Sequence, residues 1–256
     1  MAQSQFSPHT GFNPSPLVRL LGSLEIDADV DSAQTLAESL GQWVPWTDAI
    51  SLSAVLGNEA GLRTDAPAAQ DVSRANALAM QDIVRVRKEL TDAIAQDPMF
   101  AIDKPHPPAN LPARIAQDIA DLPILRRHYQ GYQRTMEERI ADLRARVRKA
   151  ASMASPALRR LAALDAVLDH ALAAQQRRWL ATVPVLLEKR FKTWAKAARL
   201  QEPRPDDSMA TLETDTKPRV GPTMKSALLA ELDIRLQPVD GMMDAIGNIP
   251  PSATTP

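Results

Sequence analysis

The 256-residue sequence has no cysteine, which excludes disulfide frameworks, thiol nucleophiles, Cys-ligated zinc and iron–sulfur clusters, and fits a reducing compartment. Long hydrophobic runs are also missing, because no apolar stretch approaches the roughly 18–20 residues that cross a bilayer. Residues 1–12 are polar and lack the basic region and apolar block of a signal peptide. Together these absences predict a cytoplasmic protein with no transmembrane segment.

Aromatic residues are scarce, with four Phe, four Trp and two Tyr, and no segment alternates strictly between apolar and polar residues. Ala, Leu, Arg, Gln and Glu instead dominate the middle of the chain, which is the composition that helices prefer. We therefore predict an all-α fold, in which an N-terminal helical unit precedes a long antiparallel helical hairpin of coiled-coil type. A disordered linker and tail complete the predicted chain.

Proline and charge divide the chain into five predicted parts. Residues 14–97 are predicted to form the N-terminal helical unit, and residues 98–112, with five prolines, an extended connector. Residues 113–200 are predicted to form the basic helical hairpin. Proline and acidic residues predict a disordered linker over residues 201–222. Residues 223–256 are expected to contain a short helix, to about Leu236, and a loose tail.

Apolar residues three and four apart predict the individual helices. The clearest covers residues 68–96 and ends before Asp97 and Pro98. Shorter helices are predicted over residues 16–26, from residue 32 or 33 to about 40, and from 47 to 56.

Two apolar stripes predict the hairpin. One face of its first arm, residues 124–153, carries Tyr129, Tyr132, Met136, Ile140, Leu143 and Val147. The second arm begins at Pro156 after a Ser155 cap and continues to about residue 200, with a kink or interruption expected at Pro184. Polar residues that fix the register interrupt its heptad at Asp165 and Gln175. The apolar members of the heptad are Leu158, Leu161, Leu168, Leu172 and Trp179.

Two segments carry a resemblance to a known family. These are Leu-Val-Arg-Leu-Leu at 17–21 and Leu-Gly-Gln-Trp-Val-Pro-Trp-Thr-Asp-Ala-Ile-Ser-Leu-Ser-Ala-Val-Leu at 40–56. They resemble the N-terminal signature of an uncharacterised proteobacterial family of helical proteins of similar length, classed as a domain of unknown function. The resemblance covers most of the chain and implies no activity and no catalytic residues. Members are encoded near envelope proteins with an OmpA-like domain, which implies a role in an envelope-linked assembly.

Residues Asp27 to Glu38 place carboxylates at positions one, three, five and twelve of a calcium-binding loop. Two positions depart from that loop, because the turn glycine is Ser32 and the apolar position eight is Gln34. Helix capping and the helix dipole explain the acidic residues more simply. We therefore predict no metal site and keep calcium as the weaker alternative.

Trp43 and Trp46 are candidates for a partner-binding anchor, because aromatic residues dominate interface hot spots. Two tryptophans three residues apart beside a helix break are more typical of core wedges in a small helical unit. The partner-binding residues therefore stay unknown. Tyr129 and Tyr132 share the apolar face of the hairpin, which indicates core positions with their hydroxyls at the rim.

Charge is unevenly distributed. Residues 1–111 carry 7 basic and 14 acidic side chains, residues 112–200 carry 18 and 8, and residues 201–256 carry 5 and 9. A basic middle binds an anionic partner, or it is balanced internally by acidic ends that pack near it. The near-zero net charge favours internal balance. Over residues 126–149 the cations surround the apolar stripe on all sides, which is typical of a solvated face. The cations of residues 177–199 keep the anionic-partner alternative open, because they make the hairpin as a whole strongly positive.

The sequence has no phosphate loop, dinucleotide fingerprint or nucleophile elbow. No pair has metal-ligand spacing among the four histidines, which are His9, His106, His128 and His170. We therefore predict no catalytic, cofactor-binding or metal-binding residues and no small-molecule substrate. The first hypothesis is a non-enzymatic helical adaptor or scaffold that acts through protein contacts or self-association. The alternative is nucleic-acid or anionic-surface binding through the basic hairpin.

Overall fold

The computed structural model describes residues 15–24, 46–57, 68–100, 111–200 and 219–248, and every element in these ranges is helical. The all-α prediction is therefore confirmed. The elements are α1 (Pro16–Ser23), α3 (Trp46–Gly57), α4 (Ala69–Ala95), the 3₁₀ helix η1 (Pro98–Phe100), α5 (Leu111–Ala154), α6 (Pro156–Leu200) and α7 (Val220–Gly247).

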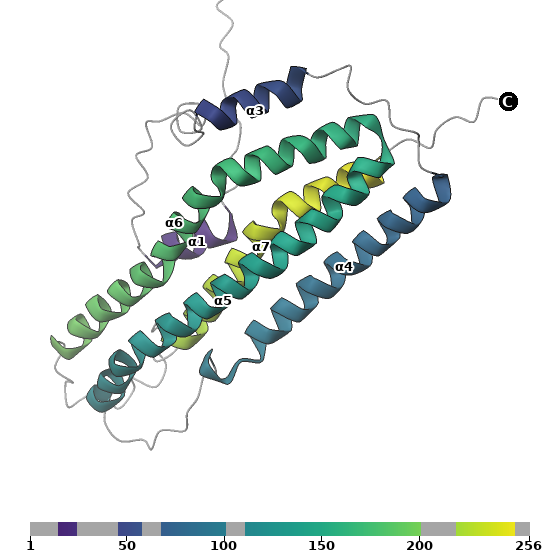
Figure 1. Cartoon of the computed structure of the whole chain (residues 1–256). Helices are drawn as coiled ribbons and strands as arrows, with labels where there is room; N and C mark the ends of the chain where they lie inside the picture. Colours follow the sequence, from purple (N-terminus) through teal and green to yellow (C-terminus); the bar gives the residue numbers. More distant parts are fainter. Residues whose placement is uncertain (1–14, 25–45, 58–67, 101–110, 201–218, 249–256) are drawn as a thin grey trace, which may run out of the picture.

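The four long helices α4, α5, α6 and α7 lie together as an elongated bundle (Figure 1). α5 and α6 meet at Ser155, whose hydroxyl accepts a hydrogen bond from the Leu158 N–H at 3.1 Å, and pack as an antiparallel hairpin. α7 contacts α1, α4, α5, α6 and η1, which makes it the central helix. Its fully buried residues include Met224, Leu228, Leu236 and Val239.

One contiguous core extends from Leu17 of α1 to Ile246 of α7. The predicted stripe of α5 lines this core, since Tyr129, Met136 and Leu143 are fully buried. The stripe of α4 packs on the same core through Ile83, Val86, Leu90 and Ile94. Because every long helix contributes apolar residues to one core, we expect the four to fold together.

The N-terminal helices are distributed over the bundle. α1 packs on α7, α3 packs on α6, and α4 packs on α5 and α7. This arrangement differs from the separate unit predicted over residues 14–97. Helices as short as α1 and α3 bury too little apolar surface to be stable without the long helices. The helix predicted near residues 33–40 lies outside the described residues.

The predicted start of the hairpin's first arm was wrong, and so were the predicted start and end of the last helix. α5 begins at Leu111 and continues through Pro123, well before residue 124, and η1 buries Phe100 within the predicted connector 98–112. α7 begins inside the predicted linker and continues through Pro238 to Gly247, far beyond the short helix expected from residue 223. Tertiary packing along the helix offsets the hydrogen bond that each proline removes.

α6 is continuous across Pro184, and Figure 1 shows it changing direction part-way along its length. The predicted heptad is only partly buried. Leu158 is buried, whereas Leu168 and Leu172 are half-buried and Trp179 is 49% exposed. Between Leu158 and Leu172, Asp165 and Asp169 of α6 instead form ion pairs with α5.

Candidate functional site

A buried polar network joins α5 and α7 in the centre of the bundle. Glu231 is fully buried, and its carboxylate accepts hydrogen bonds from the Tyr129 hydroxyl at 3.0 Å and the Gln133 amide at 2.9 Å. Arg235, one turn further along α7, donates to the same carboxylate from Nε at 2.9 Å and Nη2 at 2.7 Å. These donors compensate a buried charge that would be very costly without partners.

Gln133 also extends the network to α6. Its Nε2 atom donates to the main-chain carbonyl of Leu180 at 2.8 Å. Pro184 has no N–H, so the carbonyl of Leu180, four residues earlier, lacks its usual helical donor. The Gln133 amide supplies that donor, and it thereby attaches α5 to α6 at the proline.

Burial raises the pKa of Tyr129 well above its ordinary value, and the adjacent Glu231 carboxylate raises it further. The hydroxyl is therefore a fixed donor at neutral pH. The sequence correctly indicated a core position for Tyr129, but the hydroxyl is buried on Glu231 and does not lie at the rim. The signal for this network was Glu231 and Arg235, a charged pair at i and i+4 on the helix face that also carries Met224, Leu228 and Val239.

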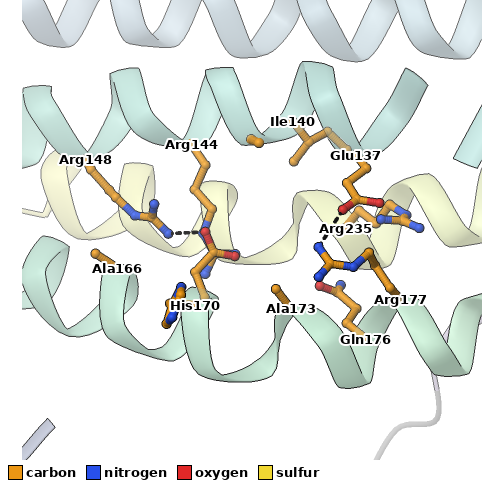
Figure 2. Close-up of a pocket in the computed structure, with 12 residues that line it drawn as sticks. Glu137, Ile140, Arg144, Arg148, Ala166, His170, Ala173, Gln176, Arg177 and Arg235 are labelled. Carbon is orange, nitrogen blue, oxygen red and sulfur yellow. Dashed lines mark hydrogen bonds and ion pairs between the residues drawn. The ribbon is translucent and has the colours of Figure 1, made fainter. Parts of the chain in front are cut away.

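A groove of about 400 Å³ lies between α5 and α6, with Arg235 contributed by α7 behind it (Figure 2). The small side chains of Ala141, Ala166 and Ala173 leave this space. The charged and titratable residues that line it are Glu137, Arg144, Arg148, Asp169, His170, Arg177 and Arg235.

Ion pairs cross the groove between the two arms of the hairpin. Arg144 Nη1 lies 2.6 Å from Asp169, and Arg148 Nε lies 2.6 Å from Asp165. Arg144 also contacts Asp165, and Arg148 also contacts Asp169. Burial favours protonation of Asp165, but hydrogen bonds from Arg144 and Arg148 outweigh it and lower the pKa. Asp165 is therefore charged at neutral pH, and the four side chains hold α5 against α6.

Other cations of the hairpin pair with acidic residues of α4, α5 and α6. These pairs are Arg126 with Glu188, Arg139 with Glu89, Arg146 with Asp82, and Arg177 with Glu137. Glu89 and Asp82 belong to α4, so part of the acidic N-terminal region balances the basic hairpin. This supports the interpretation of internal balance, and it shows that much of the hairpin's positive charge connects helices.

A second polar cluster holds the turn after α4. Asp97 accepts a hydrogen bond from the Tyr132 hydroxyl at 2.5 Å and lies 2.7 Å from His128 Nε2. Burial favours protonation of Asp97, but hydrogen bonds from Tyr132, His128 and the Met99 N–H outweigh it and lower the pKa. The Phe100 ring packs on His128, with centroids 5.4 Å apart. The cluster therefore attaches η1 to α5.

The structure does not place the remaining candidate residues from the sequence in a site. Residues 27–38, Trp43, His9 and His106 lie outside the described residues, and Trp46 is the first residue of α3. Within the described ranges, no group of three His, Cys, Asp or Glu is placed to hold a metal ion. None of the described helices combines the length and apolar character that a membrane span requires.

The family profile described as protein of unknown function DUF3348 matches residues 1–248. The chain belongs to this family. No curated protein and no solved structure matches it. The resemblance to a family of unknown function is therefore confirmed, and membership assigns no substrate, activity or partner to the groove or to the buried network.

Proposed function

We propose that the chain is a non-enzymatic helical adaptor or scaffold that acts through protein–protein contacts. The observation that carries the proposal is the ion pairing within the hairpin and between the hairpin and α4. Arg144 and Arg148 bind Asp165 and Asp169, and Arg146 binds Asp82 of α4. These charged side chains thus hold α4, α5 and α6 in fixed positions relative to one another. A rigid bundle of this kind suits a scaffold.

Surface composition also supports protein contacts. Large apolar side chains are exposed on several helices, including Val18 on α1, Ile50 and Leu56 on α3, and Val84 on α4. A partner that covers such side chains removes their apolar surface from water, which favours association. The proposal includes a cytoplasmic location and a role in an envelope-linked assembly, and fractionation of the producing cells tests the location.

Nucleic-acid or anionic-surface binding through residues 126–199 remains the alternative proposal. It has less support, because cations such as Arg139 and Arg146 already contact acidic residues of α4. A low-salt gel shift with DNA and RNA tests it. Complexes that dissociate steeply as salt rises favour the alternative, and their absence disfavours it.

A double substitution on α6 tests the adaptor proposal directly. Leu168 and Leu172 are half-buried and lie outside the main core cluster, on the helix that also holds α3. Replacing both by Asp should abolish self-association or folding, whereas Ala174→Asp, at an exposed position of the same helix, should not. Light scattering and thermal unfolding measure both effects. An unchanged melting curve and mass for the double variant would contradict the proposal.

A further inference from the structure

We propose that the outer face of α6, within residues 178–196, is a docking surface for an acidic amphipathic helix of a partner protein. This inference rests on the adaptor function proposed above and specifies where the partner binds. The outer face consists of Arg178, Thr182, Val185, Lys189, Lys192 and Lys196, all of which are exposed.

The spacing of these residues places them on one side of the helix. They follow one another at intervals of four, three, four, three and four, which keeps side chains on the same face. The buried residues of the same stretch, Val183, Leu187 and Phe191, point to the opposite side, into the bundle. In Figure 1, α3 lies along the other half of α6, nearer the turn to α5. Among the described residues, nothing covers the exposed side chains of this face, so it is accessible to another protein.

Charge on this face is of one sign. Arg178, Lys189, Lys192 and Lys196 are its ionisable residues, and Glu188 is the one acidic residue of α6 within 178–196. Glu188 is buried and contacts Arg126 at 2.8 Å and Lys192 at 2.6 Å. It therefore contributes little negative charge to the outer face. Carboxylates of a partner are the complementary groups.

An apolar centre distinguishes this face from a purely electrostatic site. Val185 is 48% exposed in the middle of the cations, and Trp179, 49% exposed, lies beside Arg178. Tryptophan and arginine are the residues most enriched where interfaces gain their energy. From residue 178 to 196 the face is about 27 Å long at 1.5 Å per residue, which matches a partner helix of about five turns.

Nucleic acid and membrane fit the face less well. A stripe of cations along one helix is also found on nucleic-acid-binding surfaces, but here Val185 interrupts the stripe and Lys192 is already paired with Glu188. Membrane-surface helices bury a continuous apolar face, whereas the outer face carries one valine among its cations. A partner helix with acidic residues on both sides of an apolar stripe complements both the cations and the exposed Val185 of the outer face.

Photo-crosslinking in the producing cells tests the inference with the full-length chain. The probe is a photoreactive amino acid in place of Val185, with the same probe at Val84 of α4 as the control, since Val84 is 60% exposed. The expected product at position 185 is a crosslink to a segment of another protein whose sequence predicts an acidic amphipathic helix. Its yield should fall about tenfold in a Lys189→Glu, Lys196→Glu background. The charge-matched control, Arg74→Glu with Arg134→Glu, should retain it.

The possible outcomes separate this inference from the function on which it rests. Protein crosslinks at position 84 without any at 185 would overturn the docking surface and leave the adaptor proposal standing. Crosslinks at 185 to nucleic acid or lipid, or to a segment without acidic residues, would also overturn it. A crosslinked product that persists in the Lys189→Glu, Lys196→Glu background would overturn the docking surface as well. Unchanged thermal unfolding of all variants shows that any loss of product arises at the surface.

Discussion

The side-chain amide of Gln133 donates a 2.8 Å hydrogen bond to the main-chain carbonyl of Leu180. That carbonyl is the one that Pro184, four residues later, leaves without a helical partner. A side chain of α5 therefore completes the hydrogen bonding of α6, and the same side chain binds the buried Glu231 of α7. Three helices thus meet at one residue.

Gln133→Leu should destabilise the fold by about 1–3 kcal/mol, because it leaves the Leu180 carbonyl without a donor and removes one of the donors to the buried Glu231. In a Pro184→Ala background the loss should be smaller, since the restored N–H at position 184 bonds to that carbonyl. Urea unfolding of the double-mutant cycle measures the difference. A Pro238→Ala background is the control and should leave the full loss. Equal losses of stability in the wild-type and Pro184→Ala backgrounds would show that the Gln133 amide does not replace the helical donor that Pro184 removes.

Glu231→Gln should destabilise the fold by about 3–5 kcal/mol, because it leaves the buried guanidinium of Arg235 without its counter-charge. Replacing Glu231 and Arg235 together by Met removes both charges and keeps similar volume. The double variant should therefore be more stable than Glu231→Gln, with a loss of about 1–3 kcal/mol because the buried Tyr129 hydroxyl loses its acceptor. Chemical denaturation measures the free energy of unfolding of the wild type and of both variants. A double variant less stable than Glu231→Gln would refute this prediction.

The hairpin should lose stability in acid. The pKa of Asp165 is lower in the folded chain than in the unfolded chain, so its stabilising contribution is complete above the unfolded value, about 3.9. The contribution disappears as pH falls through the lowered folded value. Unfolding midpoints measured from pH 7 to pH 2.5 should decline below about pH 4. Asp165→Asn should show a shallower decline, and a decline as steep as that of the wild type would contradict the assignment.

Replacement of glycine by alanine should change the stability differently at two positions. A Cβ atom at Gly221 would lie 3.2 Å from the Phe100 carbonyl oxygen, whereas one at Gly131, inside α5, would meet nothing within 4 Å. Gly131→Ala should raise stability by about 0.5–1 kcal/mol through helix propensity. Gly221→Ala should give no gain, because α7 must move away from η1. The melting temperatures of the two variants measure this difference. Equal gains would show that the close approach of Gly221 to Phe100 is not maintained.

Helix positions followed from the sequence where apolar periodicity was uninterrupted. The stripe over residues 68–96 corresponds to α4, Ala69–Ala95, and residues 47–56 to α3. The end of α7 was missed because Pro238 and Gly241 are typical of helix ends. The signal beyond them was Val239, Met242 and Ile246, whose spacing continues the buried face.

The polar contacts were harder to foresee, because they depend on which helices become neighbours. Asp165 was predicted to fix the register of the hairpin, and it does contact Arg144 and Arg148. Nothing local in the sequence pairs Gln133 with Leu180, 47 residues away. Likewise, the partnership of Arg146 with Asp82 follows from the position of α4 against α5, which periodicity alone does not determine.

Affinity capture tests whether the chain acts through protein contacts. The tagged full-length protein is recovered from its own cells at low salt, with and without nuclease, and its partners are identified by mass spectrometry. We expect a set of protein partners that survives nuclease treatment. Loss of every partner on nuclease treatment would contradict it and would make nucleic acid the ligand of the basic hairpin.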